Sequence, residues 1–272
     1  MELKGSILSK EVEVISKLYP SDVVYQVKGL VRRGVFDFDD DEVKAKRKKI
    51  TGYSKKSKRR YRFLLRNTKE IWSHEGSLSY GDDFPTDGAV VSGHLKLFIE
   101  SLQRKYRGIA WTWRKGFQQE RGKKGLGFAP HMHFLTDRFV DHKWLRERWS
   151  EIVGSSDPDH FSAGTHIDKI RNRDRIINYM VNYMASDDET TVPEGFENVG
   201  RFWGIKRGLL EYAEFNKTVP LCQGMRMMRL CKRWYRAELR SWGIYKWRPR
   251  WGKGFTVIGG RRLVDVLMKL NM

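Results

Sequence analysis

Two histidines separated by one residue, His131 and His133, form the sharpest chemical pattern in the chain. They fall in the stretch Phe128 to Leu135, whose composition predicts a strand with Pro130 near its start. Because alternate residues of a strand project to the same face, both imidazoles are expected on one face. Two neutral imidazoles at that spacing can bind one divalent ion. The alternative is a pair of surface histidines on a basic strand.

A hairpin is expected to bring a third ligand to this pair. The stretch GKKGLG predicts a turn, and pairing across it places Met132 opposite Phe117. Even-numbered residues of the first strand then share the histidine face, among them Gln118 and Glu120. Both side chains carry oxygen donors suited to Mg²⁺ or Mn²⁺.

Two tyrosines in the stretch INYMVNYM add a candidate nucleophile. Tyr179 and Tyr183 stand at i and i+4, so on a helix their hydroxyls share one face. A tyrosine oxygen can attack phosphorus, and two on one face permit two successive transfers. The phenol is mostly protonated at neutral pH, so a Lewis acid on the phosphate would help. The alternative is a tyrosine stripe packed in a core with Ile176 and Met180.

The charge of the chain indicates its partner. There are 53 Lys and Arg against 33 Asp and Glu, a formal net charge of +20. An excess of this size predicts a polyanionic partner, and nucleic acid is favoured because phosphate neutralisation releases counterions. An anionic membrane surface is the competing partner, but we find no strongly amphipathic, purely basic helix with a lipid-facing stripe.

Composition narrows the class of protein. Hydrophobic residues make up 40% and aromatic residues 13% of the chain, enough for a packed core. The stretch Met1 to Lys10 holds charges without the apolar run of a signal peptide, and no segment has the apolar length of a membrane span. Cys222 and Cys231 are expected to be reduced thiols. We therefore expect a soluble cytoplasmic protein, within a host bacterium.

The chemical residues lie in a mixed α/β region. Its expected elements are helices at 92–106, 144–153 and 176–185 and hairpin strands at 109–113 and 128–135. We expect an N-terminal extension at 1–60, the central domain at 61–207 and a basic, Trp-rich extension at 208–272. The run Lys44 to Arg62 holds eleven Lys or Arg and predicts a linker or arm suited to phosphates.

The motifs of this region resemble those of the HUH endonucleases, in particular the rolling-circle replication initiators of filamentous phages and small single-stranded DNA viruses. SLSYGDDFPTDG is similar to the family's first motif, and RGKKGLGFAPHMHFL to the hairpin of its second. NYMVNYMAS resembles the third motif, and VGRFWGI resembles a Gly-Arg-x-Trp-Gly signature that follows it. The likeness covers about Tyr61 to Arg207, with four motifs in the family's order.

The resemblance implies an α+β fold, an antiparallel sheet with helices on one face and ferredoxin-like or RRM-like topology. It implies Tyr179 and Tyr183 as catalytic tyrosines and His131 and His133 as metal ligands. The family's third ligand is usually a Glu on the first hairpin strand. The expected register puts Gly116 there, so Gln118 or Glu120 is expected to replace it.

The implied activity is metal-dependent nicking and joining of single-stranded DNA at a replication origin, through a 5′-phosphotyrosine. Unwinding and synthesis would come from a host helicase and polymerase, since the chain has no Gly-x-x-x-x-Gly-Lys-Ser/Thr motif. A relaxase or single-strand transposase would use the same chemistry. A non-catalytic nucleic-acid-binding protein and a metallohydrolase acting through activated water are the alternatives from other classes.

Overall fold

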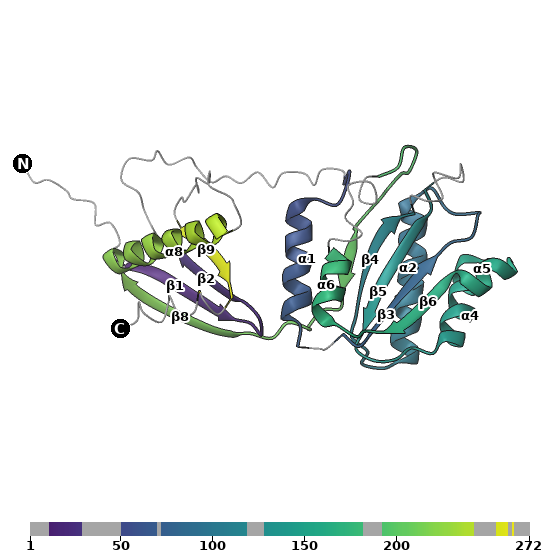
Figure 1. Ribbon diagram of the computed structural model, residues 1–272, viewed down its shortest axis with the longest axis horizontal. Coiled ribbons are helices and arrows are strands. Elements are labelled where there is room, and N and C mark those ends of the chain that lie inside the picture. Colours follow the sequence, from purple (N-terminus) through teal and green to yellow (C-terminus); the bar gives the residue numbers. More distant parts are fainter. Residues whose placement is uncertain are drawn as a thin grey trace, which may run out of the picture. The chain divides into compact units, whose positions relative to one another are not determined.

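The computed structural model describes residues 11–28, 50–69, 72–118, 128–181, 192–241, 254–260 and 263. The chain has an α+β fold with two antiparallel sheets, and it divides into two compact units (Figure 1). The larger unit spans 46–209, and the smaller unit combines 1–45 with 210–272. The described part contains no helix that is both long and apolar enough to cross a membrane.

The larger unit is built on a five-stranded sheet. Its strands are β3 (His74–Ser79), β4 (Trp111–Phe117), β5 (Pro130–Thr136), β6 (Thr165–Lys169) and β7 (Trp203–Ile205). They are ordered β6-β3-β5-β4-β7, and each neighbouring pair is antiparallel. Its helices are α1 (Lys55–Asn67), α2 (Gly88–Lys105), α4 (His142–Val153), α5 (Pro158–Ala163) and α6 (Arg173–Val181).

Helices cover both faces of this sheet, so the expectation of helices on one face is wrong. On one face Phe98 of α2 packs against Phe134, with ring centroids 5.6 Å apart. On the other face the Tyr61 hydroxyl of α1 lies 2.9 Å from the Thr112 hydroxyl. The physical reason lies in β5, where every residue except His133 is buried, because each face of the strand meets a helix layer.

Side-chain caps set the starts of the helices. Asp87 accepts a hydrogen bond from the Ala89 backbone N–H at the start of α2, and Asp141 caps α4 in the same way. Such caps contribute about 1 kcal/mol each, since they satisfy backbone donors that have no partner within the helix. At its other end α4 stops at Gly154, whose φ of 68° suits a residue without a side chain.

The basic run Lys44 to Arg62, expected as a linker or arm, is helical from Lys55 onward. Tyr61 and Leu65 explain the difference. They stand four residues apart on α1 and are both fully buried, so the helix is anchored to the core by an apolar face.

The smaller unit is built from both ends of the chain. Its strands are β1 (Glu11–Leu18), β2 (Val23–Lys28), β8 (Ala213–Pro220) and β9 (Gly254–Gly259), and its helix is α8 (Leu221–Ser241). They form an antiparallel sheet ordered β8-β1-β2-β9, in which β1 pairs with both β2 and β8.

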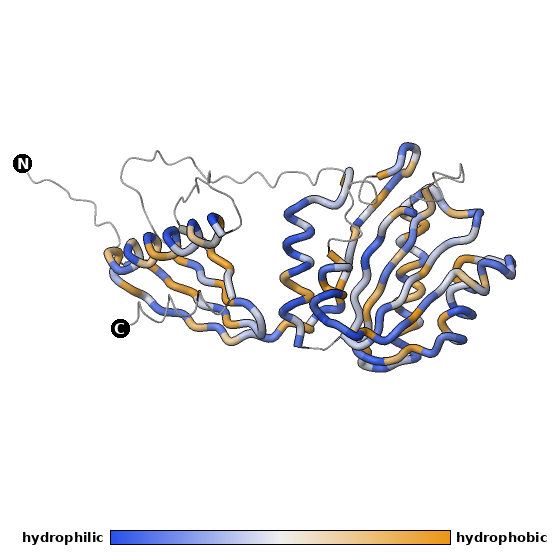
Figure 2. Tube along the Cα trace, in the orientation of Figure 1, coloured by the Kyte–Doolittle hydropathy of each residue, from blue (hydrophilic) through white to orange (hydrophobic). Residues whose placement is uncertain are grey.

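The terminal segments, expected as separate extensions at 1–60 and 208–272, thus share one unit, and the larger unit starts at 46. The reason is the core that they form together. Val12 and Val14 of β1 are buried in one cluster with Val219 of β8 and Met227 of α8. Figure 2 shows hydrophobic and hydrophilic residues alternating along β1, β2 and α8, as expected for elements with one buried face.

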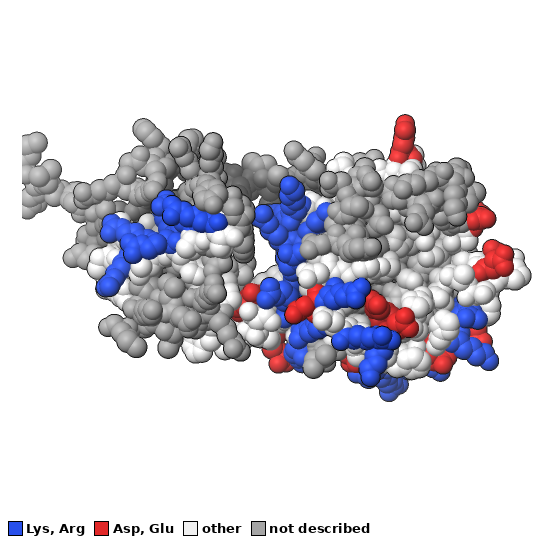
Figure 3. Space-filling model, in the orientation of Figure 1, with Lys and Arg blue, Asp and Glu red and all other residues white. Residues whose placement is uncertain are grey.

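Positive charge occurs in both units. On the face drawn in Figure 3, Lys and Arg side chains gather over α1 in the larger unit and over α8 in the smaller one. Both units therefore present exposed cationic side chains that could contact a polyanion.

Candidate active site

The His-x-His pair lies on β5 with both rings on one face of the sheet. The ring centroids of His131 and His133 are 5.0 Å apart. His131 is 6% exposed, and its Nδ1 atom has no hydrogen-bond partner among the residues that the structure describes. A buried polar atom without a partner costs about 1–3 kcal/mol, so this atom marks a place where a ligand would be favourable.

Both imidazoles are neutral at physiological pH. Burial lowers the pKa of His131 well below its ordinary value, and the neighbouring His133 and Arg114 lower it further. Burial also lowers the pKa of His133 to about 4, with added effects of Arg114 and His166. A neutral imidazole keeps the lone pair that a metal ligand donates, so the environment prepares both rings for that role.

A row of polar side chains crosses the sheet at His133. The successive Cα partners are His166 on β6, Ser77 on β3, His133 on β5 and Arg114 on β4. Directly paired residues project to the same face, so these four side chains share the face of the histidine pair. His166 is exposed, and its Nε2 lies 2.9 Å from Asp168 Oδ2.

The second row, at His131, corrects the expected register. His131 pairs with Ser79 on β3 and with Gly116 on β4, whereas Met132 pairs with Lys115 and not with Phe117. The shift is two residues, which preserves the face because the side-chain period of a strand is two. The alternation of residue types therefore predicted the face correctly, while the register depends on the connection between the strands.

Gln118 follows β4 on the histidine face. Its backbone N–H donates to the Ala129 carbonyl at 2.9 Å, which extends the pairing one step beyond β4. Its side-chain Nε2 donates to Oγ of Ser79 at 3.4 Å, and Ser79 is the β3 residue that pairs with His131. Of the two expected third ligands, Gln118 is therefore next to the pair, whereas Glu120 lies outside the described residues.

Within the described ranges, no group of three or more His, Cys, Asp or Glu side chains could hold a metal ion. The polar side chains described near the pair are the carboxamide of Gln118 and the hydroxyls of Ser77 and Ser79 on the adjacent strand.

Tyr179 reaches the same site from α6. Its ring lies edge-on to His133, with centroids 5.5 Å apart and planes at 80°. Ile176 and Met180 on the same helix are buried, whereas Tyr179 is only partly buried, so it reaches the histidine while packing against the core. Tyr183 lies outside the described residues.

Arg114 is a site residue that the motif analysis missed. It is fully buried beside His133, its Nη1 donates to the Met180 carbonyl of α6 at 3.2 Å, and its guanidinium lies 5.1 Å from the Tyr53 ring centroid. One side chain thus contacts the helix that carries Tyr179 and places a positive charge beside His133. The available signal was a cation at an even position of the strand WTWRKGF, on the predicted histidine face.

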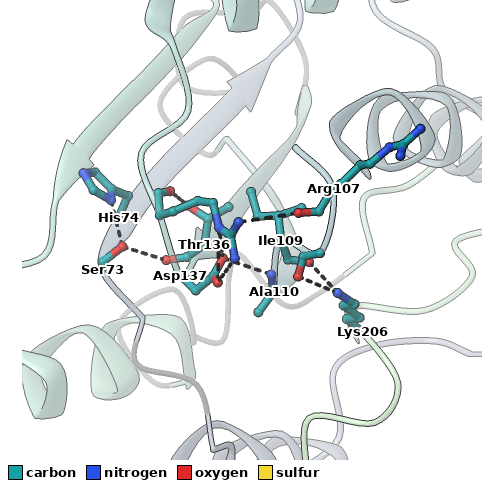
Figure 4. Close-up of polar contacts among 10 residues, drawn as sticks. Ser73, His74, Arg107, Ile109, Ala110, Thr136, Asp137 and Lys206 are labelled. Atoms are coloured by element: carbon teal, nitrogen blue, oxygen red, sulfur yellow. Dashed lines mark hydrogen bonds and ion pairs between the residues drawn. The ribbon is translucent and has the colours of Figure 1, made fainter. Parts of the chain in front are cut away.

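The far ends of the hairpin strands are held by a separate set of hydrogen bonds (Figure 4). Asp137 Oδ1 accepts from the Ala110 backbone N–H at 2.9 Å, which joins the residues flanking β5 and β4. Lys206 Nζ donates to the carbonyls of Gly108 and Ile109, each at 2.8 Å. These contacts fix the register at one end, and the histidines occupy the other half of β5.

Comparison of the chain with protein-family models, with curated proteins and with solved structures found no match. The site itself therefore carries the functional argument. It combines two neutral imidazoles, a carboxamide, a phenol and a buried guanidinium on one face of a sheet.

Proposed function

We propose that this protein is a rolling-circle replication initiator that nicks and joins single-stranded DNA through a tyrosine ester. The observation that carries the proposal is the approach of Tyr179 to the His131–His133 pair on one sheet face. The candidate nucleophile lies 179 − 133 = 46 residues from the nearer of the two candidate metal-ligand side chains in sequence. Packing alone does not require this combination of residue types.

The topology supports the same proposal. Along the chain the elements β3, α2, β4, β5, α4 and β6 follow a β-α-β-β-α-β order, with the short helix α5 added before β6. Their strands lie in the order β6-β3-β5-β4. This order supports the ferredoxin-like topology that we propose for the larger unit and that is expected for the endonuclease family. Fold analogy alone assigns no activity, so the weight rests on the side chains.

His131, His133 and Gln118 are the residues that would hold a divalent ion. The buried, unpartnered Nδ1 of His131 and the neutral state of both rings fit that role. Bound there, the ion would act as a Lewis acid on the scissile phosphate. Two nitrogens and a carboxamide oxygen suit Mn²⁺ better than Mg²⁺, which prefers an all-oxygen shell.

The chain's own residues carry the transfer. The Tyr179 oxygen attacks phosphorus, the phosphorus–O3′ bond breaks, and the 3′ oxygen takes up a proton and leaves as a hydroxyl. The products are a 5′-phosphotyrosine on the protein and a free 3′ end, which serves as a primer for a host polymerase. Tyr183 follows Tyr179 by four residues in the sequence and is the candidate for the second transfer.

The test uses labelled single-stranded DNA carrying candidate origin sequences, with Mn²⁺, Mg²⁺ or EDTA, resolved on a denaturing gel. The expected result is an SDS-resistant adduct that requires metal, forms faster with Mn²⁺, and disappears in the Tyr179→Phe/Tyr183→Phe double variant. Tyr212→Phe, in the smaller unit, is the matched control and should leave the adduct unchanged.

Each alternative function gives a different gel. Cleavage without an adduct that survives both Tyr→Phe changes would indicate a hydrolase acting through activated water. Tight binding of the origin strand without cleavage, with metal present, would indicate a non-catalytic DNA-binding protein. Transfer that needs only one tyrosine would indicate transposase-like chemistry.

A further inference from the structure

One face of α8 carries a regular row of arginines. The exposed members stand at alternating spacings of three and four residues, which keeps them on one side of the helix. They are Arg226, Arg229, Arg233, Arg236 and Arg240. From the first to the last is 240 − 226 = 14 steps, about 21 Å at 1.5 Å per residue.

The opposite face of α8 is already used by the fold. Met227 and Cys231 are buried in the core of the smaller unit, and the Met227 sulfur lies 2.8 Å from the Tyr25 hydroxyl of β2. Residue 224 is a glycine because Val12 of β1 lies 2.4 Å from where a Cβ would be. Sheet packing therefore fixes which side of α8 faces outward, and the arginine row occupies that side.

The row is not neutralised within the described part of the chain, where none of its five guanidinium groups forms an ion pair. Figure 3 shows the corresponding cluster of positive side chains over α8. Five adjacent like charges repel one another, so the row is unfavourable unless an anion lies against it. A rigid line of guanidinium groups fits phosphates, which Arg binds through paired donors.

The form of the partner follows from what the row lacks. Membrane-surface helices insert an apolar face into lipid, and the apolar face of α8 is buried against its own sheet. Single-strand binding relies on aromatic rings that stack on bases, and none of the described exposed positions of α8 is aromatic. Five exposed arginines along one side of a helix suit the major groove of a duplex, which is wide enough to admit a helix.

We propose that α8 of the smaller unit is a docking surface for double-stranded DNA, separate from the histidine and tyrosine site. The inference goes beyond the proposed nicking reaction and does not depend on it. In a protein that cuts one strand at an origin, such a surface would hold the adjoining duplex. The arginines would contribute binding affinity by contacting phosphates, and such contacts do not depend on the base sequence of the DNA.

The test measures binding of the full chain to a labelled duplex of roughly 20 base pairs, longer than the ~21 Å row, in EDTA. Fluorescence anisotropy is recorded over a series of salt concentrations. The variant is Arg229→Gln/Arg233→Gln/Arg236→Gln, which retains good helix formers. The matched control is Arg104→Gln/Lys105→Gln/Arg107→Gln, three exposed cations at and beyond the end of α2, which removes the same charge.

The expected result is a roughly tenfold or greater loss of duplex affinity in the α8 variant, with the slope of log K against log salt reduced by about 2–3. The control variant should keep the wild-type slope. Equal losses in both variants would overturn the proposal, because net charge and not the row would then explain binding. A loss of affinity in the α8 variant that is larger for a single strand, or for phosphatidylserine vesicles, than for the duplex would overturn it too.

A thiol provides a readout at the row itself. Cys222 is exposed and precedes Arg226 by four residues, whereas Cys231 is buried and burial raises its pKa to about 12. Duplex should slow alkylation of Cys222 in the wild type and much less in the arginine variant. Unchanged alkylation at saturating duplex would place the DNA elsewhere and refute the assignment.

Adduct formation on single-stranded DNA should be unaffected by the α8 changes, so failure of this proposal is distinguishable from failure of the proposed nicking activity.

Discussion

The two candidate surfaces of this molecule are built in opposite ways. The histidine site of the larger unit is mostly buried and draws on β3, β4, β5 and α6, so its geometry exists only when the sheet and helix are assembled. The arginine row of the smaller unit is exposed and belongs to a single helix. A site for chemistry needs side chains removed from water and held against one another, whereas a surface for phosphates needs charge left in water.

The comparison predicts that damage to one surface leaves the other intact. We expect His131→Ala or His133→Ala to lower the rate of adduct formation by about a thousandfold, since loss of a Lewis acid removes several kcal/mol of transition-state stabilisation. Duplex affinity should stay within twofold of wild type. The measurement pairs the denaturing gel with anisotropy on the same preparations.

His142→Ala is the control for that experiment, because His142 begins α4, whose Trp149 packs against Phe98 on the sheet face opposite the histidine pair. A His131→Ala protein that forms adduct at the wild-type rate while remaining folded would break the assignment of the pair as metal ligands. A parallel loss of duplex binding would break the separation of the two surfaces.

We expect a fall in pH to destabilise the larger unit more than the smaller unit. All seven histidines of the chain lie within 46–209, and none lies in the smaller unit. Burial lowers the pKa of His133 to about 4 and that of His131 well below its ordinary value, which is about 6.5 in an unfolded chain. Between these values the unfolded state binds more protons, so stability rises with pH. The contribution of the buried neutral rings is therefore present above pH 6.5 and lost as pH falls toward 4.

For His133 alone the difference amounts to roughly 3 kcal/mol. Hydrogen exchange followed by mass spectrometry on the full chain measures it locally. Between pH 6.5 and 4, after correction for intrinsic exchange rates, protection of β5 should fall more than protection of β1. A His133→Gln protein should show a smaller fall in β5. Equal changes in both sheets would show that histidine burial does not set the acid response.

Local sequence patterns predicted the helices and strands better than they predicted which strands pair and which helices pack together. Alternation and helical spacing placed β5, α2 and α4 close to their observed bounds, because each depends on residues adjacent in sequence. The pairing of β1 with β8 joins segments about 200 residues apart, and no local pattern encodes it. Burial of Tyr61, which turns half of a basic run into α1, is likewise a tertiary effect.

The candidate site shows the same division. His131 and His133 were identified as a pair because strand geometry alone puts i and i+2 on one face. The approach of Tyr179 to His133 needed the placement of α6 over that face, which spacing does not give. Arg114 was missed since an arginine between Trp113 and Lys115 is expected to face solvent unless a helix covers it.

Arg114 gives the last and smallest expected effect, and it tests how the buried site is held together. Its hydrogen bond to the Met180 carbonyl holds α6 to β4, and its charge lowers the pKa of His133. In Arg114→Met the charge and this bond are lost while much of the volume is kept. We expect a loss of about 2 kcal/mol in unfolding free energy, typical of a hydrogen bond to a charged group, and a rise in the pKa of His133.

Denaturant unfolding gives the first quantity and NMR titration of the His133 ring gives the second. Arg104→Met, on the exposed side of α2, should change neither. Adduct formation should fall further than the small loss of folded protein explains, because α6 carries Tyr179 and loses an anchor. If stability falls but the His133 pKa and the adduct rate per folded molecule stay at wild-type values, Arg114 acts only in packing. The geometry of the histidine and tyrosine site would then not depend on the contact between Arg114 and α6.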